Sequence, residues 1–267
     1  MYPNLRDILE LLEEMAPAAF AEAWDNPGLQ VGSFSQNVKK IFVSLDPTLK
    51  AVRAAATRKA QMLFTHHPLI FRSLSKLDLG AYPGNVIFEA INNNISVVAA
   101  HTNLDVAPGG INDILAGLLG LEKVEVLKES EGHKDVGMGR IGELSCPLSL
   151  PALLDEIRKV LGVTRPKVVV QKNDKIRRIA VVGGSGGSLI SYATKKGADL
   201  LLTGDLSHHQ ALEAESMGLS LIDAGHFYTE KAAMMIFGSH LKKAFSKRGF
   251  RVVVENDEGE VDPIHEG

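Results

Sequence analysis

The 267-residue chain has one cysteine, Cys146, and no long hydrophobic run. A single thiol excludes a disulfide within the chain and any zinc site built from several thiolates. No segment approaches the roughly 18 consecutive apolar residues that a membrane helix needs. The first residues also lack the basic and apolar pattern of a secretory signal. We therefore expect a cytoplasmic protein that does not enter a membrane.

The sequence also has no long run of residues of like charge. The 29 lysines and arginines are balanced by 32 aspartates and glutamates, which gives a net charge of -3. Nucleic-acid binding requires a basic patch, so we expect no DNA or RNA partner. Hydrophobic residues make up 45% and charged residues 23% of the chain, which is typical of folded domains and excludes a disordered or fibrous protein.

Strand and helix patterns alternate along the chain and indicate an α/β fold. The first unit of this kind is a β-α-β pattern, with strand, helix and strand over 40–45, 49–59 and 61–65. The same order returns over 178–182, 189–196 and 199–203. We predict an internal duplication in which the sheets are largely parallel and sites lie beyond the carboxyl ends of the strands.

The duplication also suggests domain boundaries. We predict a first repeat over 1–127 and a second over 128–267, with the C-terminal helix, expected over 229–247, packing back on the first repeat. The region from 127 to 174 has room only for a strand, a helix over 150–161 and another strand. No separate inserted domain is therefore expected in the middle of the chain.

Two stretches share the spacing of a histidine followed four residues later by a carboxylate. His101 and Asp105 follow an apolar run over 95–100, and His226 and Glu230 follow another over 219–224. A third apolar run ends at the adjacent histidines His66 and His67. Imidazole and carboxylate groups bind divalent cations without thiolates. These stretches predict one site with two metal ions.

Each pair also has a plainer interpretation. One of His66 and His67 would then be a hydrogen-bonded core histidine, Asp105 a helix cap, and His226 with Glu230 a surface ion pair.

Glu230 has two carboxylate oxygens, which suits it to bridge two cations about 3.5 Å apart, the separation typical of paired-metal sites.

Three other features carry weaker signals. The turn-rich stretch from Trp24 to Gly32 is interpreted as a packed loop with a buried tryptophan. The glycine-rich stretch Gly183–Ser188 is either a phosphate cradle or a tight turn, and it lacks the lysine of a P-loop. His208 and His209 begin a helix expected over 207–217, where they either shuttle protons and hold substrate or are simply solvated.

Five motifs together resemble the NIF-three-like family of dinuclear-metal-centre proteins, whose members are often named type 2 GTP cyclohydrolase I. They are Trp24-Asp25-Asn26-Pro27-Gly28-Leu29, Thr65-His66-His67-Pro68, His101-Thr102-Asn103-Leu104-Asp105, Thr203-Gly204-Asp205 and Gly225-His226-Phe227-Tyr228-Thr229-Glu230. The resemblance implies two intertwined α/β domains, a ring-shaped homohexamer and two metal ions per subunit. It also implies the short form of the family, without the inserted domain of longer members.

The same resemblance implies roles for individual residues. The metal ligands would be His66, His67, Asp105, His226 and Glu230. His101 would be a further ligand or the catalytic acid/base group. Mixed nitrogen and oxygen donors accept zinc, manganese, iron, cobalt or nickel, so the sequence does not select one metal.

Two functional hypotheses follow. The first is a dinuclear metal-dependent hydrolase acting on a nucleotide, with a GTP cyclohydrolase-like reaction in which activated water attacks the imidazole ring carbon of GTP and formate leaves. His101 is its proposed proton shuttle. The alternative is a non-catalytic metal-binding scaffold or regulatory protein that acts through its oligomeric ring. In that case Glu230→Ala removes metal or disturbs assembly, and no activity is lost because the wild-type protein has none.

Overall fold

A computed structural model describes residues 2–171 and 175–264 of the chain. These residues form two compact units: unit 1 contains those up to Leu104 and from Met234 onward, and unit 2 is Asp105–Ala233. The chain enters unit 2 within α4 (Thr102–Val106) and leaves it within α9 (His226–Lys247). The compact units therefore divide the chain differently from the sequence repeats over 1–127 and 128–267.

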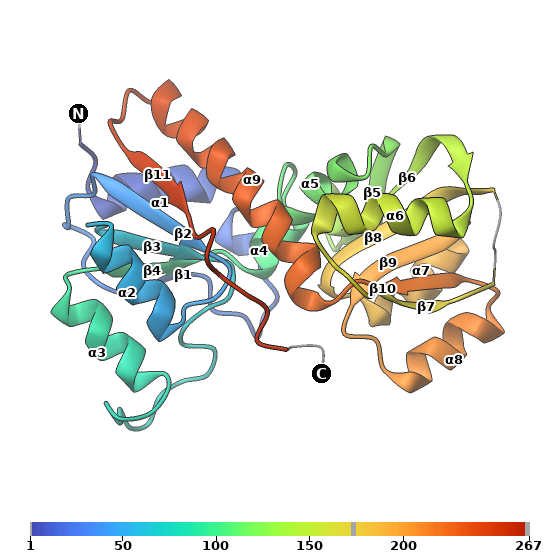
Figure 1. The fold of residues 1–267 in the computed structure, drawn as a ribbon. Coiled ribbons are helices and arrows are strands. Elements are labelled where there is room, and N and C mark those ends of the chain that lie inside the picture. Colours follow the sequence, from blue (N-terminus) through green and yellow to red (C-terminus); the bar gives the residue numbers. More distant parts are fainter. Residues whose placement is uncertain (1, 172–174, 265–267) are drawn as a thin grey trace. The chain divides into compact units, whose positions relative to one another are not determined.

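In unit 1 the described residues form a five-stranded sheet in the order β1-β4-β3-β2-β11 (Figure 1). The strands are β1 (Gly28–Val31), β2 (Lys40–Ser44), β3 (Met62–Thr65), β4 (Ser96–Ala99) and β11 (Val253–Asn256). All neighbouring strands are parallel except β1, which pairs antiparallel with β4. Thr65 lies opposite Ala99, so β3 and β4 end at the same edge of the sheet.

Helices cover both faces of this sheet. They are α1 (Leu5–Met15), the 3-10 turn η1 (Ala18–Phe20), α2 (Leu49–Thr57), α3 (Gly84–Asn92) and the later part of α9. Leu63 packs in the core beneath α2 and α3. The next residue, Phe64, points to the opposite face, where its ring centroid lies 6.0 Å from that of Phe237 on α9. Glu14 at the end of α1 pairs with Arg248 just after α9.

In unit 2 six strands lie in the order β5-β6-β8-β9-β10-β7 within the described part of the chain. They are β5 (Glu122–Ser130), β6 (His133–Leu148), β7 (Lys167–Val169), β8 (Ile176–Ser185), β9 (Leu200–Gly204) and β10 (Ser220–Asp223). Only β8, β9 and β10 pair in parallel; the other three pairings are antiparallel. The prediction of largely parallel sheets is thus confirmed for unit 1 and wrong for unit 2, because β5 and β6 are joined by a short hairpin, which requires antiparallel pairing.

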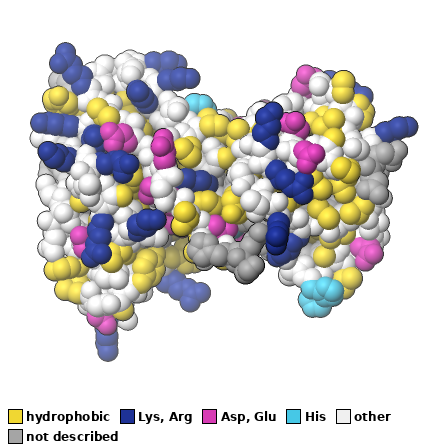
Figure 2. Space-filling model, in the orientation of Figure 1, with side chains coloured by type: hydrophobic (Ala, Val, Ile, Leu, Met, Phe, Trp, Pro, Cys, Tyr) yellow, Lys and Arg dark blue, Asp and Glu magenta, His cyan; other side chains and the backbone are white. Residues whose placement is uncertain are grey.

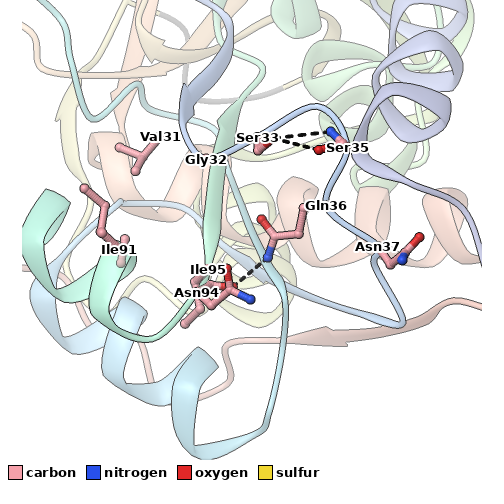
Figure 3. A pocket seen from close by; sticks show the side chains of 10 residues that line it. Val31, Gly32, Ser33, Ser35, Gln36, Asn37, Ile91, Asn94 and Ile95 are labelled. Atoms are coloured by element: carbon pink, nitrogen blue, oxygen red, sulfur yellow. Dashed lines mark hydrogen bonds between the residues drawn. The ribbon is translucent and has the colours of Figure 1, made fainter.

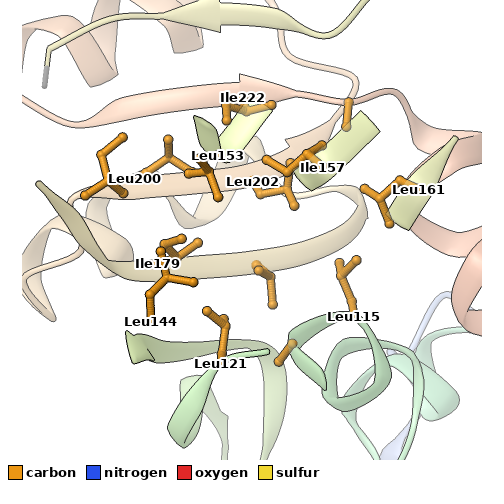
Figure 4. Close-up of a cluster of buried hydrophobic side chains, with 14 of the residues drawn as sticks. Leu115, Leu121, Leu144, Leu153, Ile157, Leu161, Ile179, Leu200, Leu202 and Ile222 are labelled. Carbon is orange, nitrogen blue, oxygen red and sulfur yellow. The ribbon is translucent and has the colours of Figure 1, made fainter. Parts of the chain in front are cut away.

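The core of unit 2 follows the alternation of side chains along its strands. Its helices are α5 (Ile111–Leu118), α6 (Leu150–Leu161), η2 (Gly187–Leu189), α7 (Ile190–Lys195) and α8 (His208–Ser216). Leu200 and Leu202 face α5 and α6 (Figure 4), whereas Leu201 faces α7 and α8. The predicted helix over 150–161 is confirmed, with Ser149 as its N-cap and Gly162 in the left-handed conformation at its end.

The two units repeat one arrangement. In each, a strand, a helix and a parallel strand lead to a third parallel strand, and an antiparallel edge strand completes that side: β1 beside β4, and β7 beside β10. The amide of Ala100 donates to the carbonyl of Thr65 at 3.0 Å, and the amide of Ala224 donates to that of Thr203 at 2.8 Å. The predicted α/β fold with an internal duplication is confirmed.

The surface and the helix lengths agree with the composition. On the face drawn in Figure 2, lysine and arginine side chains are scattered rather than gathered into one stripe. Among the residues described, no helix combines the length and the apolar character needed to cross a membrane.

Substitution of Leu202 tests this description of the core of unit 2. Its side chain is fully buried, so Leu202→Ala leaves a cavity and should lower the free energy of unfolding by about 2–5 kcal/mol. Leu212→Ala removes an exposed leucine on α8 and should change it by less than about 0.5 kcal/mol. Urea unfolding of both variants makes the comparison, and equal losses would contradict this account of the core.

Candidate functional site

Three histidines of unit 1, His66, His67 and His101, form what we call the histidine cluster. They follow β3 and β4, which end at the same edge of the sheet. One ring nitrogen of each lies within 4.8 Å of the others. The ring centroids are 5.1 to 5.5 Å apart, and the His66 ring is fully buried.

An oxygen acceptor holds each ring of the histidine cluster at Nδ1. His66 Nδ1 lies 2.9 Å from the carbonyl oxygen of Ala100, and His67 Nδ1 lies 2.7 Å from Oδ1 of Asp46. Because a carbonyl or carboxylate oxygen can only accept, Nδ1 carries the proton and Nε2 keeps the lone pair of the neutral ring. Metal-binding histidines show this pattern, in which one ring nitrogen donates to oxygen and the other binds the cation.

His101 has the same arrangement with Asp25, at 2.8 Å from Nδ1 to Oδ1. The amide and the hydroxyl of Thr102 donate to the other oxygen of Asp25, at 3.0 and 2.5 Å. Burial by itself would raise the pKa of Asp25, but the hydrogen bonds from His101 and Thr102 and the charge of His101 outweigh it and lower the pKa to about 2. Asp25 is therefore ionised at neutral pH.

In unit 2, Asp105, His226 and Glu230 form what we call the acidic cluster. His226 begins α9 and Glu230 lies one turn later on the same helix face. His226 Nδ1 lies 2.7 Å from Oδ2 of Asp205, and its Nε2 lies 3.2 Å from Oε2 of Glu230. A carboxylate oxygen of Asp105 lies within 4.8 Å of one of Glu230.

The acidic cluster concentrates lone pairs in a buried place. Asp105 is 6% exposed and Glu230 is 3% exposed. Two ionised carboxylates at this distance repel each other, and burial increases the cost. Because Nδ1–H of His226 donates to Asp205, Nε2 of that ring carries a lone pair and can only accept. Nε2 lies 3.2 Å from Oε2 of Glu230, which is also an acceptor. A proton or a cation must lie between two such acceptors.

Backbone and side-chain contacts fix this cluster. The side chain of Asn112 donates to the carbonyl of Asp105 and accepts from the amide of Gly183, both at 2.9 Å. Gly184 adopts φ +62°, and a Cβ there would collide with Oε1 of Glu230. The glycines therefore let the backbone approach Glu230 closely.

The glycine-rich stretch Gly183–Ser188 is the end of β8 followed by η2, and three of its amides are used within the protein, which does not favour a phosphate cradle. Its amides at positions 183, 184 and 186 donate to the side chains of Asn112, Thr229 and Thr203. A phosphate cradle requires backbone N–H groups that point at the ligand. His208 and His209 are exposed at the start of α8, as expected for a solvated helix start.

The plainer interpretations of two ligand candidates do not hold. Asp105 lies inside α4, so it is not the cap of that helix, and Glu230 is too buried for a surface ion pair. The unit boundary falls inside α4, so His101 and Asp105 belong to different units although only four residues separate them in the chain.

Sequence reasoning missed the partners of the histidines. Asp46 comes two residues after β2, Asp205 directly after β9, and Asp25 lies in the loop before β1. Each is 21 or more residues from its histidine. The available signal was that Asp46 and Asp205 both follow the carboxyl end of a strand, where sites of parallel sheets lie.

One hollow of unit 1 lies away from the histidine cluster. It encloses about 540 Å³ and is lined by polar side chains such as Gln36 together with Asn94 and Ile95 (Figure 3). Asn94 and Ile95 precede β4, whereas His101 follows it. This hollow therefore lies at the amino end of β4, away from the histidine cluster.

Comparisons with known proteins agree along the whole chain. A model of the family described as Duf34/NIF3 (NGG1p interacting factor 3) matches residues 3–260. A protein of Clostridium acetobutylicum named GTP cyclohydrolase 1 type 2 homolog is 34% identical over 261 residues, which cover 97% of both chains. GTP cyclohydrolase 1 type 2 of Helicobacter pylori strain J99 is 33% identical over 252 residues, 94% of this chain and 96% of that one. The crystal structure of a Bacillus cereus protein related to NIF3 has a TM-score of 0.94 at 26% identity and covers all of both chains.

The depressed pKa of Asp25 predicts a pH-dependent contribution to stability. Because the pKa falls from 3.8 to about 2 on folding, the contribution is complete above the unfolded value and is lost as the pH falls through about 2. Asp25→Asn should therefore lower the free energy of unfolding by roughly 2 kcal/mol at neutral pH, and the difference from wild type should shrink between about pH 4 and pH 2. Urea unfolding with a chelator present measures it. The exposed Asp155 supplies the control variant Asp155→Asn, and a loss for Asp25→Asn that does not change with pH would contradict the assignment.

Proposed function

The chain belongs to the Duf34/NIF3 (NGG1p interacting factor 3) family, and on this premise we propose that it is a dinuclear metal-dependent hydrolase with a GTP cyclohydrolase-like reaction. The two relatives named GTP cyclohydrolase 1 type 2, or its homolog, support the choice of reaction. Both match nearly the full length of this chain.

One observation carries the metal part of the proposal. Each of the four histidines of the two clusters directs Nδ1 to an oxygen, of a backbone carbonyl for His66 and of an aspartate for the others. Such contacts fix the tautomer and the orientation of the ring and make Nε2 a better donor to a cation. If these histidines only filled the core, there would be no reason for all four to direct Nδ1 to an oxygen acceptor.

The donor sets of both clusters fit divalent cations. His66 and His67 of the histidine cluster, and Asp105, His226 and Glu230 of the acidic cluster, are the proposed ligands of two ions. Bound cations of this kind polarise a substrate and make water nucleophilic near neutral pH. In the acidic cluster they would also remove the repulsion between two buried carboxylates. Zinc, manganese, iron, cobalt and nickel all suit these donors.

The chain's own residues supply the proton transfer. The ionised Asp25 accepts from Nδ1 of His101 and keeps Nε2 as the basic nitrogen. Formate release from the ring carbon needs two waters. In the first step Nε2 accepts a proton from the water that attacks the ring carbon and gives it to the ring nitrogen whose bond to that carbon breaks, which leaves a formamide. A second water, activated in the same way, cleaves the remaining carbon–nitrogen bond and releases formate. Asp25 remains ionised and fixes the ring during both transfers, as the aspartate does in a serine-histidine-aspartate triad. The homohexamer implied by the family stays a prediction.

The proposal is tested by formate release from GTP. Purified protein loaded in turn with each of the five metals should release formate with at least one of them. His101→Asn should lower the rate by about 100-fold or more, because general acid–base catalysis contributes that much. His240→Asn, a change on α9 outside both clusters, is the control and should leave the rate unchanged.

Metal content, measured on the same samples, separates the two roles of His101. The proton shuttle requires that His101→Asn keeps its metal while losing rate. If metal-loaded wild type releases neither formate nor phosphate from any nucleotide, the hydrolase is contradicted and the scaffold hypothesis takes its place.

A further inference from the structure

Two large aromatic side chains of unit 1 are exposed beside the histidine cluster. Trp24 is 57% exposed and Phe71 is 47% exposed. The interpretation of Trp24 as a buried loop residue is therefore wrong. Burying such a side chain would stabilise the fold, so its exposure leaves apolar surface in water that a ligand or partner can cover.

Both rings contact His101. The centroid of Trp24 lies 5.9 Å from that of His101 at an interplanar angle of 73°, and that of Phe71 lies 6.4 Å away at 70°. Trp24 and Phe71 are 5.7 Å apart at 53°. The two contacts with His101 are edge to face and the Trp24–Phe71 contact is tilted, so none of the three is a parallel stack and an aromatic face remains for a further ring.

The loops that carry these rings are held together by side-chain amides. Asn26 donates to the carbonyl of Ile70 at 2.7 Å, and Gln30 accepts from the amide of Ile70 at 3.1 Å. Asp25, the neighbour of Trp24, holds His101. The loops that carry the two rings are thus held near His101 before any ligand arrives, which lowers the entropic cost of binding.

We propose that Trp24 and Phe71 form a stacking platform for the purine base of the nucleotide substrate. The proposal rests on the proposed function, because that function supplies a substrate with a planar heterocycle. Aromatic side chains stack on every base through its π-face. The contacts with His101 place the platform beside the residue that transfers the proton.

A second copy of the chain is the competing occupant. Leu74, Leu77 and Leu79, which follow Phe71 in the same loop, are also exposed, and exposed apolar side chains also serve protein–protein contacts. The substrate is favoured because both rings touch His101, and the experiment separates the two.

Trp24 is the only tryptophan, so the protein's tryptophan fluorescence reports this position alone. The full-length, metal-loaded protein is titrated with GTP, with guanosine and with ribose 5-triphosphate, which lacks the base. We expect saturable quenching by GTP and guanosine and none by ribose 5-triphosphate. N-acetyl-tryptophanamide titrated in parallel corrects for absorption by the base.

Variants measure the strength of stacking. Phe71→Ala should raise the Kd of GTP roughly 5- to 150-fold, the range expected for loss of base–aromatic stacking. Trp24→Ala should raise the Kd of GTP similarly, as measured by calorimetry because this variant has no tryptophan. Trp24→Phe keeps an aromatic face, so its Kd should stay near that of the wild type. Phe34→Ala, at a comparably exposed phenylalanine of unit 1, is the matched control and should leave the Kd unchanged.

The outcomes distinguish this proposal from the proposed function. Formate release by wild type, with no quenching and an unchanged KM in Trp24→Ala, would overturn the platform and leave the hydrolase standing. Base-dependent quenching by a protein that releases no formate would support the platform alone. A smaller assembly of Trp24→Ala in light scattering, with unchanged nucleotide affinity, would assign the rings to a contact between copies and overturn the proposal.

Discussion

The hydrogen bond from Nδ1 of a histidine to an oxygen acceptor is the interaction on which the candidate site depends. It occurs at His66, His67, His101 and His226 with lengths between 2.7 and 2.9 Å. In each case it removes the freedom of the ring to turn and decides which nitrogen carries the lone pair. Without these contacts the four rings would have neither a fixed orientation nor a fixed tautomer. With them, each ring keeps the lone pair of Nε2 available to a cation.

The duplicated sheet explains why these contacts form. In each unit the parallel strands end at one edge, so residues just beyond different strands meet although they are distant in the chain. Asp205 follows β9 and His226 follows β10, and the pairing of Thr203 with Asp223 brings them together. In unit 1 the pairing of Thr65 with Ala99 does the same for the histidine cluster. A single fold principle thus generates a histidine held by an aspartate in both units.

Sequence reasoning succeeded where the signal is local. The helix over 150–161 has a serine cap and a terminal glycine, and both ends are confirmed. It failed where the structure depends on which strands pair. Strand β5 was not predicted, and its antiparallel hairpin with β6 makes the sheet of unit 2 mixed. The candidate histidines were chosen from their positions after apolar runs. Their pairing with Asp25, Asp46 and Asp205 was not predicted, because no spacing rule links residues that are distant in the chain. The exposure of Trp24 was missed because a tryptophan in a turn-rich stretch is usually packed.

The most direct measurement is the number of metal ions per chain, by mass spectrometry of protein purified without chelators or a histidine tag. The account predicts about two ions in wild type and a loss in both His67→Asn and Glu230→Gln, which alter one cluster each. Glu215→Gln on the exposed side of α8 should leave the number unchanged. A value near zero in wild type, or two ions in both cluster variants, would contradict the account and return these histidines and carboxylates to a structural role.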